Sequence, residues 1–251
     1  MGKSSEGKSH KSRLDAELVR RGYVSSRTRA QGLIMAGRVM VNGCRVDKAG
    51  SMVRAESDIE ILASATPYVS RGGLKLEGVL QDVVLDVRGF VCLDVGASTG
   101  GFTDCLLKHG AARVYAIDVG RNLLDISLRE DPRVIAIEGC NARYVQPDLI
   151  PEKVDLITID VSFISLTLVI PAVMPFLKRG GYLLTLIKPQ FELSRQEVGK
   201  GGVVREEAVR LKAVEKMQMF VSRAGLDVRN WVPSRVKGPR GNQEYFMLSS
   251  T

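Results

Sequence analysis

Val91-Cys-Leu-Asp-Val-Gly-Ala-Ser-Thr-Gly-Gly-Phe-Thr-Asp104 is the stretch of this 251-residue chain that decides its fold. An apolar run ends at Asp94, glycine and other small residues follow, and a helical pattern then continues to His109. This order predicts a strand, a tight turn and the start of a helix. Glycine lets a ligand approach the backbone closely because it carries no side chain. We therefore predict a site for a nucleotide-like ligand at this turn.

From Tyr68 onward, strand patterns alternate with helical patterns. The expected strands are Phe90–Asp94, Arg113–Asp118, Val134–Ile137, Val154–Asp160, Tyr182–Ile187, Val228–Val232 and Tyr245–Leu248. The clearest helix covers Arg205–Arg223. This alternation predicts an α/β domain over residues 68–251, with a doubly wound, mostly parallel Rossmann-like sheet. Ligands of such sheets bind beyond the carboxyl ends of the strands, so residues just past strand ends are the candidates for function.

Residues 12–61 have the pattern of a separate, small α+β unit. A first helix ends at Gly22, and Ser25 or Ser26 can cap a second helix that ends at Gly37. Leu14, Leu18 and Val19 mark the first helix, and the residues expected on the buried side of the second are Ala30, Leu33, Ile34 and Met35. Short strands are expected at Val39–Val41 and Asp58–Ile61, with Asn42-Gly43 as a turn. A flexible basic tail (1–11) and a linker (62–67) complete the division.

Positive charge is concentrated in the N-terminal part of the chain. Residues 1–50 hold 11 Lys/Arg and 4 Asp/Glu, which is +7 of the formal net charge of +8. A local basic module of this kind binds polyanions through phosphate contacts and counterion release. The alternative is a solvated basic surface without a ligand.

Cysteine spacing and hydropathy argue against other classes of protein. The chain has four cysteines and no C-x-x-C pair, so we expect reduced thiols and no metal site. The first residues lack the apolar core of a signal peptide, and no uncharged apolar run of 18 residues occurs. We therefore expect a cytoplasmic protein without a membrane segment.

The glycine turn has a second acidic residue at a suitable distance. Asp94, Gly96, Ser98 and Gly100 form D-x-G-x-S-x-G, whereas the strict dinucleotide fingerprint would have glycine at 98. The next strand ends at Asp118, 24 residues after Asp94, where a carboxylate can accept hydrogen bonds from both ribose hydroxyls of an adenosine. NAD and S-adenosylmethionine both carry that ribose. The candidate cofactor residues are Asp94, Gly96, Ala97, Ser98, Gly100, Gly101, Phe102, Asp118 and Asn141.

The candidate catalytic residues are charged residues in apolar surroundings. Histidine chemistry is not expected, because the chain has only His10 in the tail and His109 at a helix end. Asp160 and Lys188 lie at predicted strand ends, where burial of a charge costs several kcal/mol unless the charge is paired or used. Lys75 lies just before the predicted sheet begins, and Glu244 opens the last predicted strand. Each alone fits a structural ion pair, but together they favour a site that moves a proton.

Two family resemblances agree with this division. Arg13-Leu-Asp, Ser26-Arg27, Ala30, Gly37-Arg-Val39 and Val41-Asn-Gly43 resemble the S4 RNA-binding domain. Residues 68–248 resemble the FtsJ-like ribose 2′-O-methyltransferase domain, most specifically in Tyr68–Leu76 and Asp94–Phe102. The order of the two matches the TlyA family, whose members often carry the label hemolysin A.

The resemblance implies an S-adenosylmethionine-dependent enzyme that methylates a cytidine 2′-hydroxyl of ribosomal RNA, with ribosomal subunits as partners. It implies a Lys-Asp-Lys-Glu tetrad at Lys75, Asp160, Lys188 and Glu244 and a methyl-donor site at the glycine turn. It also makes the arginines of the S4-like unit candidates for phosphate contacts. They are Arg13, Arg20, Arg21, Arg27, Arg29 and Arg38.

Three other functions compete with this one. The label of the family suggests a membrane-lytic protein, which would need an amphipathic or apolar membrane segment. An RNA-binding protein with an inactive methyltransferase-like domain is a second alternative. An NAD-dependent dehydrogenase is a third, although it lacks the strict glycine fingerprint and a catalytic histidine.

Overall fold

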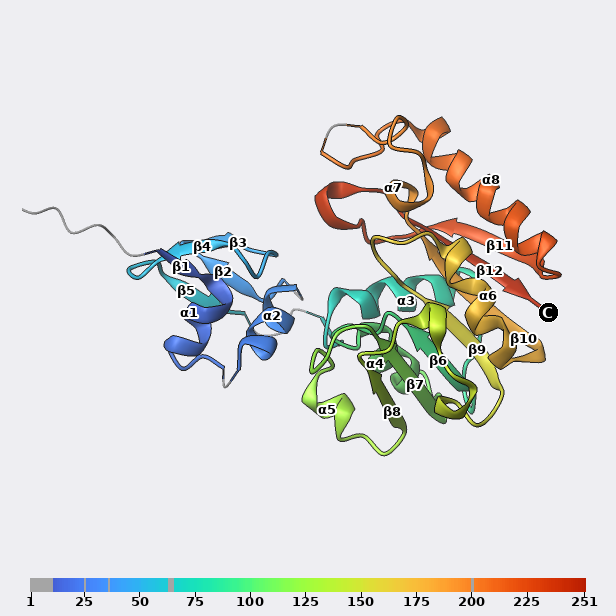
Figure 1. The fold of residues 1–251 in the computed structure, drawn as a ribbon, viewed down its shortest axis with the longest axis horizontal. Coiled ribbons are helices and arrows are strands. Elements are labelled where there is room, and N and C mark those ends of the chain that lie inside the picture. Colours follow the sequence, from blue (N-terminus) through green and yellow to red (C-terminus); the bar gives the residue numbers. More distant parts are fainter. Residues whose placement is uncertain (1–10, 25, 36, 63–65, 200) are drawn as a thin grey trace, which may run out of the picture.

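The computed structural model describes residues 11–24, 26–35, 37–62, 66–199 and 201–251, which form two units in chain order (Figure 1). Most of the expected tail, the middle of the linker and Ser25 lie outside the described residues. The N-terminal unit consists of β1 (Lys11–Arg13), α1 (Leu14–Arg20), α2 (Arg27–Met35), β2 (Val39–Val41), β3 (Cys44–Arg45), β4 (Met52–Arg54) and β5 (Ile59–Ile61). Its strands form an antiparallel pair, β1-β4, and a three-stranded sheet ordered β3-β2-β5.

A small apolar core holds the N-terminal unit together. Leu14, Leu18, Ala30 and Ile34 from the two helices are fully buried with strand residues such as Val39. The prediction for Met35 was wrong, because its side chain is 47% exposed at the end of α2. Leu33 and Val19 are only partly buried. Strands β1, β3 and β4 were not expected. Each ends in an arginine, whereas β2 and β5, which were predicted, begin and end with an apolar residue.

The turns of this unit follow the local sequence. Asn42 and Gly43 both have positive φ (49° and 74°), as a two-residue hairpin turn requires, and they join β2 to β3. Ser26 Oγ accepts a hydrogen bond from the Arg29 amide at 3.2 Å, so Ser26 caps α2.

The C-terminal unit is an α/β layer structure. Its helices and strands are α3 (Arg71–Asp82), β6 (Val91–Val95), α4 (Gly101–Lys108), β7 (Arg113–Asp118), α5 (Ile126–Arg129), β8 (Val134–Glu138), β9 (Val154–Ile159), α6 (Ile170–Val173), β10 (Leu177–Ile187), α7 (Pro189–Glu192), α8 (Glu207–Arg223), β11 (Asp227–Pro233) and β12 (Tyr245–Ser250). Short 3₁₀ turns at η1 (Ala142–Tyr144), η2 (Pro147–Leu149), η3 (Leu166–Leu168), η4 (Met174–Phe176) and η5 (Pro239–Gly241) complete it. The seven predicted strands are confirmed.

The seven strands form one sheet in the order β11-β12-β10-β9-β6-β7-β8. The five strands β8, β7, β6, β9 and β10 are parallel, whereas β12 runs antiparallel to both β10 and β11. The chain builds outward from β6 to β8 and then returns to β9 on the other side of β6. This doubly wound topology confirms the expected fold and places its switch point between β6 and β9.

Both faces of the sheet are buried, which explains why its central strands are continuously apolar. One apolar cluster includes Leu93, Ile157 and Leu183, and the other includes Cys92, Leu156 and Leu184. Because β6, β7, β9 and β10 are parallel, their carboxyl ends lie at the same edge of the sheet, and the candidate site lies at this edge.

Candidate active site

The glycine turn after β6 takes backbone conformations that most side chains avoid. Gly96 and Gly100 have φ of +88° and +94°, and Ser98 between them has φ of +49°. A Cβ on Gly96 would lie 2.5 Å from the Asp160 carbonyl oxygen, so only glycine fits there. The turn is thus packed directly against the segment that follows β9.

A second glycine contact joins the N-termini of α3 and α4. A Cβ on Gly101 would lie 2.3 Å from Ser70 Oγ and 2.9 Å from the Gly73 amide nitrogen. Gly73 in turn lies against the Tyr68 ring, 2.2 Å from where a Cβ would be. The glycines of both motifs thus permit close packing of the two helix starts, which brings α3, the helix that carries Lys75, next to the glycine turn.

Asp118, at the end of β7, faces the glycine turn. Its Oδ2 accepts a hydrogen bond from the Ser98 amide and its Oδ1 one from the Gly120 amide, both at 2.7 Å. A carboxylate oxygen can accept a second hydrogen bond, so Asp118 retains capacity for two hydroxyls. Asn141 is exposed after β8, and its Oδ1 accepts the Arg143 amide at 3.1 Å, which leaves its NH₂ group as a donor.

Asp94, in β6, is a buried carboxylate, and its role as a cofactor residue stays a prediction. Its carboxylate is fully buried and accepts hydrogen bonds from the hydroxyls of Thr103 at 2.7 Å and Thr158 at 3.1 Å. Burial raises the pKa of Asp94 to about 7, against the opposing effect of the two hydroxyls. Asp94 therefore ties α4 to β6 and β9. Phe102 is also buried and packs against Phe246, so only its backbone is available near the turn.

The four charged candidates come together as two ion pairs. Lys75 Nζ lies 2.5 Å from Glu244 Oε2, and Lys188 Nζ lies 2.6 Å from Asp160 Oδ1. Lys188 follows β10, Asp160 follows β9, and Glu244 directly precedes β12, so neighbouring strands bring these three groups together.

Asp160 is the electrostatic link between the two pairs. Burial acts to raise the pKa of Asp160, but the ammonium groups of Lys188 and Lys75 outweigh it and hold the pKa below its usual value. One carboxylate is therefore stabilised by both lysines and stays ionised.

Glu244 is the most enclosed member of the tetrad. Its side chain is fully buried, and its Oε1 has no hydrogen-bond partner within the described part of the chain. A Cβ on Gly238 would lie 2.1 Å from Oε1, so a glycine at 238 makes room for the carboxylate.

Sequence reasoning missed three residues at this site. Ser162 Oγ accepts a hydrogen bond from Lys188 Nζ at 2.8 Å. Phe163 is 91% exposed, has φ of +66°, and its ring centroid lies 5.1 Å from that of Phe191. Ser162 and Phe163 come just after Asp160, and Phe191 comes three residues after Lys188. These positions were the available signal, because residues past a strand end were already the candidates.

In the N-terminal unit, two buried carboxylates order most of the candidate arginines. Asp15 accepts hydrogen bonds from Arg13 and Arg27, and Glu17 accepts them from Arg20 and Arg21. The side chains of Arg13, Arg20 and Arg27 remain 49–62% exposed, whereas Arg21 is 20% exposed.

Arg21, Arg29 and Arg38 differ in what they contact. Arg21 also donates to the carbonyls of Ser57 and Ala55, each at 2.7 Å, and Arg38 donates to the Leu62 carbonyl at 3.1 Å. Arg29 is exposed on α2. Exposed guanidinium groups with fixed positions suit phosphate contacts, whereas Arg21 holds the unit together.

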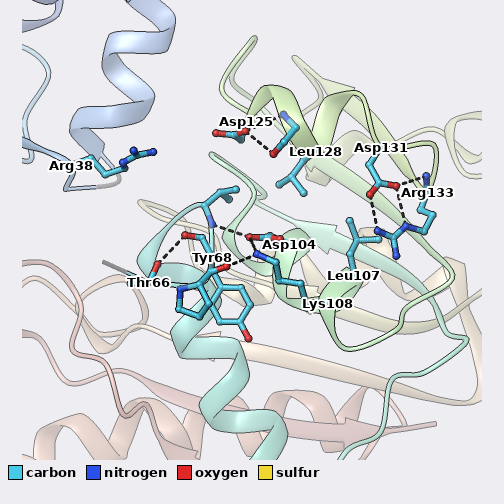
Figure 2. A pocket seen from close by; sticks show the side chains of 13 residues that line it. Arg38, Thr66, Tyr68, Asp104, Leu107, Lys108, Asp125, Leu128, Asp131 and Arg133 are labelled. Atoms are coloured by element: carbon cyan, nitrogen blue, oxygen red, sulfur yellow. Dashed lines mark hydrogen bonds and ion pairs between the residues drawn. The ribbon is translucent and has the colours of Figure 1, made fainter. Parts of the chain in front are cut away.

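A pocket of about 430 Å³ lies apart from the tetrad, where the chain enters the C-terminal unit (Figure 2). The Val69 amide donates to Asp104 Oδ2 at 2.9 Å, Thr66 Oγ1 donates to the Tyr68 carbonyl at 2.9 Å, and Lys108 contacts both Asp104 and the Pro67 carbonyl. The bonds that Val69 donates to Asp104 and that Lys108 donates to the Pro67 carbonyl fasten the end of the interdomain segment to α4, the helix that begins at the glycine turn.

The described residues contain neither a membrane-spanning helix nor a metal-binding cluster. None of their helices is long and apolar enough to cross a membrane. They also contain no cluster of three His, Cys, Asp or Glu side chains that could hold a metal ion.

Comparison with known proteins identifies the family. Residues 68–250 match the FtsJ-like methyltransferase family and residues 12–59 match the S4 domain. The chain is 43% identical over 242 residues to the 16S/23S rRNA (cytidine-2′-O)-methyltransferase TlyA of Mycobacterium tuberculosis, covering 96% of this chain and 90% of that protein. This chain belongs to the TlyA family.

Other TlyA-family relatives carry a different label. Hemolysin A of Brachyspira hyodysenteriae is 42% identical over 235 residues, which cover 93% of this chain and 98% of that protein. A solved structure described as a candidate hemolysin from Streptococcus thermophilus is 40% identical with a TM-score of 0.73, over 96% of this chain and 88% of that one. Relatives that are similarly close to this chain in sequence are thus named either as rRNA methyltransferases or as hemolysins.

Proposed function

We propose that this protein transfers a methyl group from S-adenosylmethionine to a cytidine 2′-hydroxyl of ribosomal RNA. The observation that carries the proposal is the pair of buried lysine–carboxylate contacts beside the glycine turn. Lys75 with Glu244 and Lys188 with Asp160 provide ammonium and carboxylate groups at 2.5 and 2.6 Å, at the edge of the sheet where ligands bind. The rRNA methyltransferase relative at 43% identity supports the same substrate class.

The residues around the turn fit a methyl donor that carries an adenosine. Asp118 can accept hydrogen bonds from ribose hydroxyls, and the Asn141 amide can donate to an adenine edge. The closely packed glycine turn admits a ligand near its backbone at the start of α4. When bound, S-adenosylmethionine supplies an electrophilic methyl carbon on a sulfonium.

Lys188 is the residue proposed to take the hydroxyl proton. In its neutral amine form, Nζ accepts that proton while the 2′-oxygen bonds to the methyl carbon in an in-line displacement. The bond between the methyl carbon and sulfur breaks, and its electron pair stays on sulfur, which leaves as a neutral thioether. When Lys188 changes charge, the Lys75 ammonium still stabilises the Asp160 carboxylate through its charge. Glu244 in turn holds Lys75 in place at 2.5 Å. Positioning of the two reactants supplies much of the rate.

The N-terminal unit supplies RNA affinity in this proposal. Arg13, Arg20 and Arg27 present exposed guanidinium groups held by buried carboxylates, and Arg29 adds another on α2. Such groups bind phosphates but do not select a sequence. The 2′-hydroxyl at the tetrad then distinguishes RNA from DNA as the substrate.

The experiment combines labelled S-adenosylmethionine with isolated ribosomal subunits and compares the wild-type protein with Lys188→Ala. We expect incorporation into RNA by the wild type and a loss of about 10²–10⁴-fold in the variant, the usual contribution of a general base. Binding of S-adenosylmethionine should change by less than about twofold, since Lys188 takes no part in the glycine turn. Protection of the modified nucleotide from alkaline cleavage would place the methyl group on a 2′-oxygen.

Lys178→Ala is the matched control. Lys178 also forms a lysine–aspartate pair, with Asp155 at 2.6 Å, but its side chain is 44% exposed. We expect this variant to retain wild-type transfer. Normal transfer by Lys188→Ala would remove the assignment of the base, and methylation of a nucleobase would remove the assignment of the substrate atom.

A further inference from the structure

The two segments that carry Asp160 and Lys188 are joined by successive contacts. Lys188 contacts Asp160 and Ser162, and three residues further along, Phe191 packs against Phe163. The segment after β9 therefore runs beside α7, the short helix after β10. The position of the catalytic pair depends on how these two segments are held together.

Glu192, next to Phe191, also binds the segment that follows β9. Its Oε2 accepts a hydrogen bond from Ser165 Oγ at 2.6 Å, and its Oε1 accepts one from the Leu166 amide at 2.8 Å. Glu192 is only 5% exposed. A carboxylate at this depth is costly unless its partners are well placed, so the contact strongly favours one relative position of the two segments.

Lys216 fastens the same point to the long helix α8. Its Nζ donates to the Glu192 carbonyl at 2.5 Å and lies 3.6 Å from Glu192 Oε2. Glu192 is four residues past Lys188, and Ser165 is five residues past Asp160. The carboxylate thus joins three elements close to both partners of the catalytic ion pair.

We infer that Glu192 is a positioning residue for methyl transfer: it fixes the segment bearing Asp160 and Ser162 against Lys188. The inference rests on the proposed function. Glu192 acts through its bonds to Ser165 and Leu166 and contacts no reacting group. Misplacement of reacting groups by about 1 Å can cost 10²-fold in rate. Loss of the Glu192 carboxylate should therefore lower kcat by a larger factor than it lowers the affinity for substrate.

The test compares Glu192→Ala, Glu192→Gln and Ser165→Ala in the full chain. Steady-state methylation of ribosomal subunits gives kcat, its pH profile and KM for RNA, and hydrogen exchange reports on residues 161–168. We expect Glu192→Ala to lower kcat at least tenfold, alter its pH profile, leave S-adenosylmethionine affinity within about twofold and speed exchange at the Leu166 amide. Glu192→Gln retains an acceptor oxygen and should recover part of the rate. Ser165→Ala removes one bond and provides a milder variant if Glu192→Ala does not fold.

Glu197→Ala is the matched control, because Glu197 has similar partners on the surface. It accepts from Ser194 Oγ at 2.8 Å and lies 3.6 Å from Lys212, also on α8. We expect wild-type kcat in this variant. An unchanged kcat in folded Glu192→Ala or Ser165→Ala, or unchanged exchange at residues 161–168, would overturn the positioning role. An inactive wild type would overturn the proposed function instead, and the exchange result would still show whether Glu192 holds the segment.

Discussion

Asp15 in the S4 unit and Asp94 in the methyltransferase unit are both fully buried carboxylates, but their partners differ. Asp15 accepts hydrogen bonds from Arg13, Arg27 and Gln31, whereas Asp94 accepts them from two threonine hydroxyls. Hydrogen bonds from Arg13, opposed by burial, lower the pKa of Asp15, whereas burial raises the pKa of Asp94 to about 7. Depth alone therefore does not decide whether a buried carboxylate is ionised; the charge of its partners does.

The largest expected effect is a pH dependence of the methyltransferase unit that comes from Asp94. Between about pH 4 and 7 the folded state keeps the Asp94 proton and the unfolded state releases it, so stability falls as pH rises. The difference between 3.8 and about 7 corresponds to at most about 4 kcal/mol. Urea unfolding, followed by the fluorescence of the single tryptophan, Trp231 in β11, measures this unit.

Asp94→Asn should remove that pH dependence, since an amide does not titrate and can still bond to both threonines. Asp148→Asn, which changes an exposed carboxylate of the same unit, should keep the wild-type slope. An equal slope in wild type and Asp94→Asn would mean that Asp94 is ionised despite its burial.

The next largest expected effect is a loss of stability of the S4 unit when Asp15, the carboxylate bound by arginines, is replaced. Asp15→Asn places an NH₂ group against two guanidinium groups, and we expect the S4 unit to lose about 1.5–3 kcal/mol, the usual value of hydrogen bonds to a charged group. Hydrogen exchange over residues 12–61, compared with residues 68–250, would show whether the loss is confined to this unit. Asp47→Asn, on the surface of the same unit, should have little effect.

The pH dependence of the two units should also have opposite sign. The lowered pKa of Asp15 gives stability that is complete above the ordinary carboxyl range and is lost only in stronger acid. Asp15 should therefore cause no change in the free energy of unfolding of the S4 unit between pH 5 and 7. In the same range, the contribution of Asp94 to the stability of the methyltransferase unit does change. If the free energies of unfolding of both units changed in the same direction between pH 5 and 7, the proposed difference between the two carboxylates would be wrong.

How far the sequence predicts each unit follows from the same physical differences. The strands of the large sheet were predictable because burial on both faces makes them continuously apolar, and Lys188 and Asp160 were found because charge at the end of such a strand is conspicuous. Among the short strands of the S4 unit, β2 and β5 begin and end with an apolar residue and were predicted, whereas β1, β3 and β4 end in an arginine and were not. The side-chain direction of Asp94 was not predictable, since it depends on hydroxyls from α4 and β9.

Contacts between loops were the other part that the sequence did not reveal. Glu192 and Ser165 are 27 residues apart and meet only because β9 and β10 are neighbours in the sheet. No local pattern marks either residue: Glu192 ends the four-residue helix α7, and Ser165 directly precedes the 3₁₀ turn η3.

The smallest expected effect separates arginines that bind RNA from those that hold the S4 unit together. Arg29→Gln removes an exposed charge, so it should weaken RNA binding and reduce the salt dependence of log K by about one phosphate contact, without a change in stability. Arg21→Gln should instead destabilise residues 12–61, because Arg21 donates to Glu17 and to the carbonyls of Ser57 and Ala55. Binding titrations at several salt concentrations, with hydrogen exchange on the same samples, distinguish the two. If Arg29→Gln left the salt slope unchanged while Arg21→Gln reduced it without loss of protection, guanidinium exposure would not be what selects the phosphate contacts.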